Sequence, residues 1–195
     1  MGLGCERFEN ICISKMKNEI DIVRDVSKKL DSASIQYMLT GSVAMNYYSL
    51  PRMTRDIDIV IQIGKEDIST IVNLFKADYY VEPDSIDIAI QSERLFNIIH
   101  DESFIKVDFI IRKSGNYRLE EFERRKKIEF GDFQTFIVSK EDLILSKLLW
   151  SKKSKSEMQK RDIQNLVKSE VDLNYLEQKL NELNLKDWYE EIMNE

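Results

Sequence analysis

Two aspartates lie one residue apart inside an otherwise apolar run, DIDIVIQI, at residues 56 to 63. Side chains two apart in a strand point to the same side, so Asp56 and Asp58 project together while the isoleucines fill the opposite face. Two carboxylates this close repel each other, and an unpaired buried carboxylate is costly. The pattern predicts a cation in front of both, and Mg²⁺, which prefers oxygen ligands, is the natural candidate.

A third carboxylate, Asp108, lies in a second apolar run, FIKVDFIIR, at residues 104 to 112. A strand formed by this run could lie beside the strand that carries Asp56 and Asp58. Three carboxylates from two neighbouring strands are what a two-metal site for phosphoryl or nucleotidyl transfer needs. We therefore expect these three aspartates to be both the catalytic residues and the ligands of two Mg²⁺ ions.

A glycine–serine step precedes the aspartates. The short apolar run YMLT ends at Gly41, and Ser42 begins a stretch rich in small residues, which suits a helix capped by the serine hydroxyl. The N-terminus of such a helix presents backbone N–H groups to an anion. We expect a nucleoside triphosphate to bind there, with Arg52 and Arg55 adding charge-assisted contacts to its phosphates.

The rest of the chain predicts a mixed α/β region followed by helices only. The fold class is therefore α/β (α+β), with a short mixed sheet flanked by helices over residues 1–139 and a helical lobe over residues 140–195. A hairpin is expected at Gly131–Asp132, where two β runs meet. The expected strands further include 94–100 and 104–112, and the expected helices are 6–31, 65–77, 84–93, 140–152, 156–169, 173–183 and 186–193.

Composition limits the class of protein. The 195 residues are 43% apolar and 33% charged, which is typical of a soluble globular protein. No apolar run approaches the roughly 18 residues of a membrane-spanning helix, so we expect no membrane partner and a cytoplasmic location. His100 is the only histidine, which leaves little material for a zinc cluster or a Ser-His-Asp triad.

Charge is unevenly distributed. The net charge is −6, which argues against wholesale coating of nucleic acid. However, the segment from Lys147 to Arg161 is strongly basic, with Glu157 as its acid, whereas residues 170–195 hold eight acids and two lysines. The basic segment is either a solvated face or a local site for RNA.

The carboxylates and the glycine–serine step together resemble the DNA polymerase beta superfamily of nucleotidyltransferases. That superfamily has a Gly-Gly or Gly-Ser pair, about a dozen residues, an Asp-x-Asp between apolar residues, and a later carboxylate in a strand. This chain has Gly41-Ser42, the intervening residues 43 to 55, Asp56-Ile57-Asp58, and Asp108. The resemblance implies a nucleotidyltransferase fold and a nucleoside triphosphate as substrate.

Beyond residue 139, the segments SKEDLILSKLLW and QKRDIQNL resemble the last two motifs of the abortive-infection type nucleotidyltransferase toxins and of related bacterial proteins. The resemblance covers roughly residues 36 to 166. It implies that Lys147 helps to hold the nucleotide and that Arg161 and Asp162 support the site. It also implies a toxin–antitoxin context, with an antitoxin protein as a possible partner.

Helical spacing supports the inward orientation of two of these charges independently. Lys147 falls inside an apolar arc of its predicted helix, and Asp162 falls between Met158 and Leu166 on the next. One interpretation is a buried Lys147–Asp162 ion pair between two helices. The other is that Lys147 reaches the triphosphate, and both can hold at once.

The acceptor stays open at this level. An RNA end, such as a transfer-RNA acceptor stem, is favoured by the toxin-like motifs and the basic segment. The alternatives are a small hydroxylated molecule such as an aminoglycoside, a protein hydroxyl, and a non-catalytic module that only binds a nucleotide or a partner. The aromatic residues Tyr47, Tyr48, Trp150 and Trp188 are interpreted as packing residues rather than base-stacking platforms.

Overall fold

The computed structural model describes residues 17–49, 51 and 56–194. Arg52 and Arg55, expected at the phosphates, lie outside these residues. The strands are β1 (Gln36–Leu39), β2 (Asp56–Gln62), β3 (Tyr79–Tyr80), β4 (Leu95–His100), β5 (Lys106–Ile111), β6 (Lys126–Phe130) and β7 (Phe133–Ile137). The helices are α1 (Glu19–Ser32), α2 (Gly41–Tyr48), the short 3₁₀ helix η1 (Lys65–Asp67), α3 (Ile68–Phe75), α4 (Pro83–Ser92), α5 (Asn116–Glu123), α6 (Lys140–Ser154), α7 (Glu157–Leu166), α8 (Leu173–Glu182) and α9 (Lys186–Asn194).

The strands form one seven-stranded mixed sheet in the order β3-β4-β5-β2-β1-β7-β6. Strand β2 pairs with β5 in parallel, and β1 pairs with β7 in parallel. The remaining neighbours are antiparallel. The sheet therefore brings β2 and β5 side by side at its centre, although more than forty residues separate them in the chain.

One face of the sheet is apolar and covered by helices α1 and α3. Ile59 of β2 and Phe109 of β5 are register partners and fully buried. Phe75 of α3 lies against Phe109 with the ring centroids 5.6 Å apart, and Ser27 of α1 forms a hydrogen bond with Thr135 of β7. The isoleucines that alternate with the aspartates of β2 thus form the core on this side.

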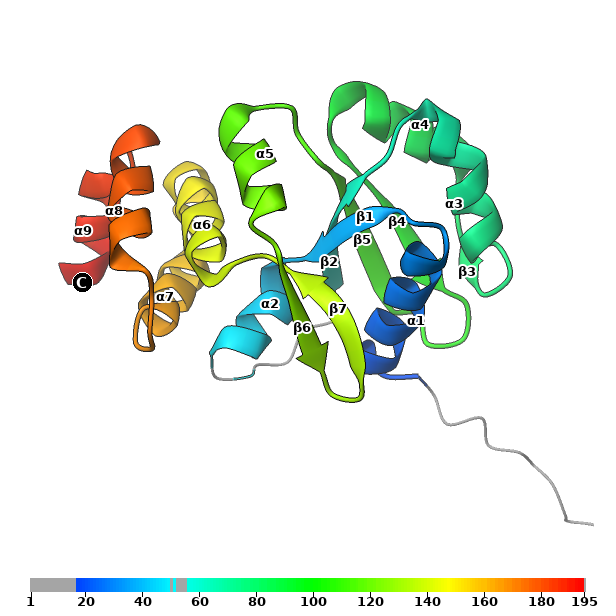
Figure 1. The fold of residues 1–195 in the computed structure, drawn as a ribbon, viewed down its shortest axis with the longest axis horizontal. Helices are drawn as coiled ribbons and strands as arrows, with labels where there is room; N and C mark the ends of the chain where they lie inside the picture. Colours follow the sequence, from blue (N-terminus) through cyan, green and yellow to red (C-terminus); the bar gives the residue numbers. More distant parts are fainter. Residues whose placement is uncertain (1–16, 50, 52–55, 195) are drawn as a thin grey trace, which may run out of the picture.

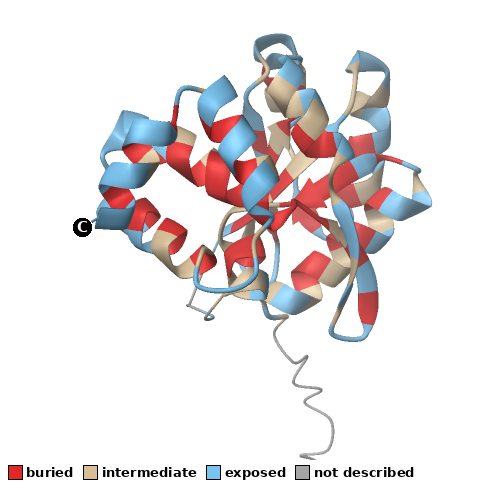
Figure 2. Cartoon of the chain, turned by 60° about the vertical axis from the view of Figure 1, so that its left-hand side comes forward, coloured by how far each residue is buried: buried red, intermediate tan, exposed pale blue. Residues whose placement is uncertain are grey.

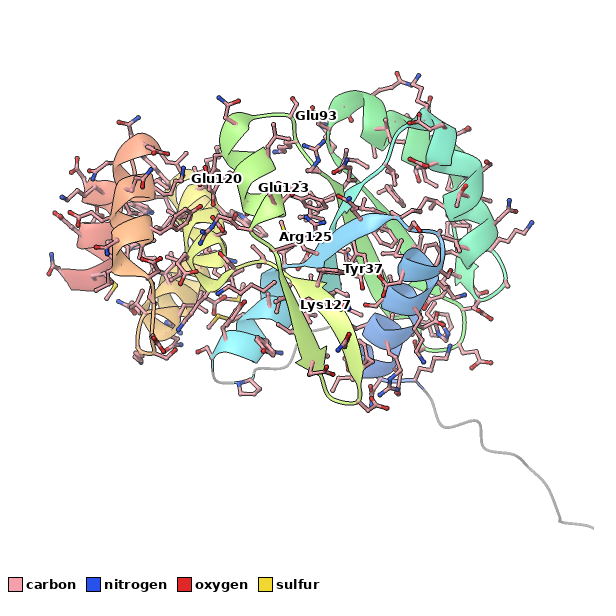
Figure 3. The ribbon with its side chains drawn as sticks, viewed as in Figure 1. Tyr37, Glu93, Glu120, Glu123, Arg125 and Lys127 are labelled. Atoms are coloured by element: carbon pink, nitrogen blue, oxygen red, sulfur yellow. The ribbon has the colours of Figure 1, made fainter. Side chains whose placement is uncertain are left out.

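The C-terminal helices α6 to α9 gather at the opposite side of the molecule from α3 and α4 (Figure 1). Their inner surfaces are buried and their outer surfaces exposed (Figure 2). A buried polar cluster ties them to the sheet region, because Asp142 of α6 accepts hydrogen bonds from Arg124 after α5 and from Tyr175 of α8. Lys179 of α8 also pairs with Glu120 of α5, which is labelled in Figure 3.

Most expected elements are confirmed, including the α/β class with C-terminal helices, the hairpin and the two strands β4 and β5. The first helix differs in part, because α1 begins at Glu19 with Asn18 as its N-cap, and the expected helical residues 6–16 lie outside the described residues. Asn18 and Asp21 form a capping box, a start signal that the apolar periodicity concealed. Helix α5 and the two-residue strand β3 were not predicted.

Candidate active site

The predicted carboxylates meet at the centre of the sheet. Asp58 of β2 and Asp108 of β5 are direct register partners, and Asp56 is opposite Lys106. Because partners in a parallel pair project to the same face, all four side chains lie on the face opposite the apolar core. Asp56 is exposed, Asp58 is half-buried and Asp108 is buried, so the cluster deepens along the strands.

Lys106 places an ammonium group among these carboxylates. Its Nζ lies 2.8 Å from Oδ2 of Asp108 and 3.7 Å from Oδ1 of Asp56. The hydrogen bond to Asp108 and the charges of Asp108, Asp56 and Asp58 together raise the pKa of Lys106. Lys106 was not predicted as a site residue, although its position two residues before Asp108 places it on the same face of the strand.

The first residue of α2, Gly41, lies directly against Asp58. Gly41 has a φ of +57°, and a Cβ built on it would come within 2.0 Å of Asp58 Oδ2. The Thr40 backbone N–H also donates to the Asp58 carbonyl oxygen at 2.9 Å. Only glycine combines this backbone conformation with this close approach, so the glycine–serine step and the Asp-x-Asp pair form one local unit.

Ser42 does not cap helix α2, contrary to the sequence-based expectation. The helix begins at Gly41 with Thr40 as its N-cap residue, and the Ser42 hydroxyl donates to the Asp56 carbonyl oxygen at 3.2 Å. The serine therefore connects the start of α2 to the start of β2. The α2 N-terminus lies beside the carboxylates, as expected for a site that binds an anion there.

Asp58 is electrostatically unfavourable as an anion. Burial raises the pKa of its carboxyl group, and the charges of Asp108 and Asp56 raise it further. The hydrogen bond from the Ser42 backbone and the charge of Lys106 oppose this shift only in part. The local environment therefore favours either a proton or an additional cation at this carboxylate.

A metal ion can be tested against this donor set. Among the described residues, no three His, Cys, Asp or Glu side chains lie close enough to form a ready-made metal site. Oδ1 of Asp108 is nevertheless buried without a hydrogen-bond partner, and the Lys106 ammonium already occupies a cationic position between two carboxylates. Carboxylate oxygens suit Mg²⁺, so the chemistry of this donor set fits the ion.

A cavity of about 360 Å³ extends from this cluster toward the C-terminal helices. Its sheet side contains Asp58, Val60 and Ile110, and Arg112 and Lys113, which directly follow β5, also line it. Helices α5, α6 and α7 form the other wall. The cavity brings together three of the predicted site residues, namely Gly41, Asp58 and Lys147.

On the helical side, Lys147 is buried and paired. Its Nζ donates to Asp162 Oδ2 at 2.7 Å and to Gln159 Oε1 at 3.0 Å, and Lys147 is 5% exposed. The predicted ion pair between α6 and α7 is therefore present, and Lys147 also lines the cavity. Arg161 is exposed and does not line the cavity, so the structure brings it to neither the carboxylates nor Lys147.

A second buried charge on this wall was missed. Glu121 of α5 is 4% exposed and accepts hydrogen bonds from Arg118 at 2.7 Å and from Ser146 at 2.6 Å. Burial raises the pKa of Glu121, and the Arg118 charge opposes the shift. No residue pattern indicated Glu121 as a site residue, because helix α5 itself was not predicted.

Trp150 is exposed and lines the cavity, not the core as expected. Trp188, in contrast, is 7% exposed and donates to the Ser151 hydroxyl at 2.9 Å, as a packing residue should. Trp150 lies on the same helix as Lys147 and Lys153, which both line the cavity. It therefore presents an aromatic surface where a planar group could stack.

The basic segment is largely engaged within the protein. Lys152 donates to the Asn184 carbonyl, Lys155 lies over the Trp188 ring, and Lys160 is buried beside the same ring. Lys153 and Arg161 are the exposed members that no hydrogen bond or ring contact engages in the part of the chain that the structure describes. The segment thus offers less free positive charge than its sequence indicates.

Known structures share this architecture. A nucleotidyltransferase-like antigenic protein from Paracoccidioides brasiliensis aligns with a TM-score of 0.54 at 18% identity, covering 76% of this chain and 74% of that one. The lincosamide antibiotic adenylyltransferase LnuA, solved with lincomycin bound, aligns with a TM-score of 0.53 at 16% identity, covering 76% of this chain and 96% of that one. This chain has a nucleotidyltransferase-like fold.

The nucleotidyltransferase-like fold is supported by structure alone. No protein-family model matches the sequence, and no curated protein matches it. At identities below 20%, the shared property is the fold and not the reaction. Within the described residues, no helix is long and apolar enough to cross a membrane.

Proposed function

We propose that this protein is a Mg²⁺-dependent nucleotidyltransferase that moves a nucleoside monophosphate from a nucleoside triphosphate to an acceptor hydroxyl. The observation that carries the proposal is the register of Asp58 against Asp108, with the Gly41–Ser42 turn packed onto Asp58. A nucleotidyltransferase-like fold with these residue types at its sheet centre favours this chemistry over a purely structural role.

Asp56, Asp58 and Asp108 are the residues that would hold Mg²⁺. When bound, the two ions would neutralise the phosphate charge that develops during transfer. A binding module without chemistry would have little reason to gather three carboxylates and to bury one of them with an unpartnered oxygen. This argues against the non-catalytic alternative.

The other residues bind and orient the substrates. The backbone at the N-terminus of α2, with Ser42, contacts the β- and γ-phosphates. Asp108 accepts the proton of the acceptor hydroxyl, whose oxygen forms a bond to the α-phosphorus while the bond to the β-phosphate oxygen breaks and pyrophosphate leaves. Lys147 approaches the nucleotide from the helical side, and Asp162 holds it there. We further propose that residues 1–139 form the catalytic lobe and residues 140–195 the helical lobe.

An RNA end is the acceptor class we favour. Arg112, Lys113 and Lys153 line the cavity beside Trp150. Basic side chains together with an exposed aromatic ring suit single-stranded RNA, because the basic side chains bind its phosphates and the aromatic ring stacks with its bases. A polycationic aminoglycoside would be repelled by the same residues. A toxin role and an antitoxin partner follow only from the sequence resemblance and stay predictions.

A small organic acceptor is the second candidate. Val60, Ile110, Leu143 and Leu149 give the cavity apolar walls, which suit a compact molecule. LnuA, with the same fold, was solved with lincomycin. A weakly charged molecule with an apolar face would satisfy these walls better than an aminoglycoside.

The acceptor can be identified directly. The purified protein is incubated with Mg²⁺, each of the four α-labelled nucleoside triphosphates and total bacterial RNA, and RNA and protein are then resolved on one denaturing gel. We expect label in an RNA band, reduced several-fold when Trp150 and Lys153 are replaced by Ala and reduced steeply by added salt. Label that appears only on protein, or only in a small-molecule fraction, would contradict the RNA assignment but not the transfer reaction.

A further inference from the structure

Lys106 stands in an unusual place for a lysine. It is in register with Asp56 and lies two residues before Asp108, on the face of the sheet that carries the carboxylates. Its Nζ contacts Asp108 at 2.8 Å and Asp56 at 3.7 Å. A lysine needed only for solubility would point to solvent, whereas this one is turned into the group of aspartates.

The two oxygens of Asp108 are used differently. Oδ2 accepts the Lys106 ammonium, and Oδ1 is buried without a hydrogen-bond partner. The lysine therefore determines the orientation of Asp108 by holding one oxygen and leaving the other toward the interior. Lys106 is also 37% exposed at its side chain, and a long flexible stem at a half-open position can swing outward without disturbing the core.

We propose that Lys106 is a positioning residue that competes with the divalent cation for Asp56 and Asp108. Its ammonium keeps the carboxylates together against their mutual repulsion, and it moves outward when a divalent cation takes over that role. This inference rests on the proposed function, because it takes the three aspartates as the metal ligands. It assigns to Lys106 a role in metal affinity and in the stability of the metal-free protein.

Metal affinity tests the competition. Mn²⁺ binding to the full chain is measured by the loss of the free-ion electron paramagnetic resonance signal, for wild type, Lys106→Met and Lys106→Arg. Removing the unit positive charge that contacts Asp108 and Asp56 should lower the Mn²⁺ dissociation constant about tenfold in Lys106→Met. Lys106→Arg keeps the charge and should bind Mn²⁺ no more tightly than wild type. Lys126→Met, an exposed strand lysine far along the sheet on β6, is the matched control and should leave the constant unchanged.

Thermal unfolding tests the positioning role. In EDTA, Lys106→Met should melt at a lower temperature than wild type, because the carboxylates lose their internal counter-ion. In saturating Mg²⁺, the difference should shrink or reverse, because the cation supplies the missing charge. A merely structural lysine would produce the same loss of melting temperature in both conditions.

The outcomes separate this inference from the function on which it rests. Tighter Mn²⁺ binding by Lys106→Met with a Mg²⁺-dependent difference in melting temperature supports the inference. Suppose that Lys106→Met binds Mn²⁺ as wild type does or more weakly, and that Asp58→Asn does not bind Mn²⁺. This result overturns the role of Lys106 alone. Wild-type protein that binds no Mn²⁺ at the aspartates overturns both the inference and the proposed metal site.

Discussion

The carboxylate cluster on the sheet and the helical side of the cavity differ in their balance of positive and negative side chains. On the sheet, the carboxylate floor (Asp56, Asp58 and Asp108) meets the cavity at Asp58, and among the described residues Lys106 is the cation that pairs with it. On the helical side, the helical wall (Arg118 and Glu121 of α5, Lys147 of α6 and Asp162 of α7) pairs Lys147 with Asp162 and Arg118 with Glu121. The floor therefore carries excess negative charge, and the wall is close to neutral.

Under the proposed function, this difference separates the residues that would do chemistry from the residues that hold the site together. An unbalanced negative charge lowers the stability of the metal-free protein. Replacing a carboxylate of the floor should therefore lower activity without lowering the free energy of unfolding. A balanced buried pair contributes to packing and orientation, and breaking it leaves an uncompensated charge. Variants on the two sides should therefore have opposite effects on turnover and on the free energy of unfolding.

The largest effect is expected at the floor. Asp58→Asn should lower the rate of nucleotidyl transfer by on the order of 10³-fold, because a metal ligand contributes several kcal/mol to transition-state stabilisation. The melting temperature in EDTA should not fall, because the variant removes a buried negative charge. Initial rates and thermal unfolding measure the two quantities, and Asp84→Asn, an exposed residue of α4, is the matched control. Retained turnover in Asp58→Asn would refute the role of the floor.

Variants of the helical wall should lose more stability than activity. Lys147→Met removes the positive charge that pairs with the buried carboxylate of Asp162 and should lower the free energy of unfolding by about 3 kcal/mol. The double variant Lys147→Met/Asp162→Leu should recover most of that stability, because both charges are gone. Denaturant titration of the four members of this cycle gives the coupling energy. If the double variant recovers turnover as well, Lys147 has no role at the nucleotide.

An intermediate effect is expected where the floor meets the start of α2. Gly41→Ala adds a Cβ within 2.0 Å of Asp58 Oδ2 to a residue with a φ of +57°. It should lower the free energy of unfolding by about 2 kcal/mol and also lower the transfer rate. Gly131→Ala is the control, because Gly131 has a φ of +67° but its Cβ would contact nothing within 4 Å. Equal losses in the two variants would show that backbone strain alone is responsible.

The smallest effect concerns the pH dependence of the wall. Burial raises the pKa of Glu121 above its usual 4.5, so the folded state binds the proton of this group more tightly than the unfolded state does. Its contribution to stability therefore declines as pH rises from the ordinary glutamate pKa through the raised one. The free energy of unfolding of Glu121→Gln, relative to wild type, should increase over that range. A difference that does not change with pH would show that Arg118 fully compensates the burial of Glu121.

The carboxylate floor could be predicted from the sequence because it depends on local rules. Alternation along β2 places Asp56 and Asp58 on one face, and the apolar runs around Asp58 and Asp108 are typical of buried neighbouring strands. The pairing of these runs is confirmed at the register of Asp58 with Asp108. The apolar periodicity of the C-terminal segment likewise predicted helices α6 to α9.

The helical wall was harder to predict from the sequence, because its residues come together only through tertiary packing. Glu121 lies on a short helix without a clear apolar period, and nothing in its local sequence indicates that Arg118 and Ser146 would surround it. Trp150 has the residue type of a core residue, and only the placement of α6 beside the cavity exposes it. The free positive charge of the basic segment was overestimated from the sequence. Lys152 and Lys155 are engaged by a hydrogen bond and a ring contact to distant parts of the chain, which the sequence does not show.

The central claim is that the carboxylate floor catalyses nucleotidyl transfer. The ratio of pyrophosphate released to acceptor labelled tests this claim most directly. Pyrophosphate release and transfer of α-label to the acceptor are followed together in one reaction with Mg²⁺, for wild type and Asp58→Asn. The account predicts one pyrophosphate for each labelled acceptor in wild type and neither product in Asp58→Asn. Label transfer or pyrophosphate release that persists undiminished in Asp58→Asn would contradict it.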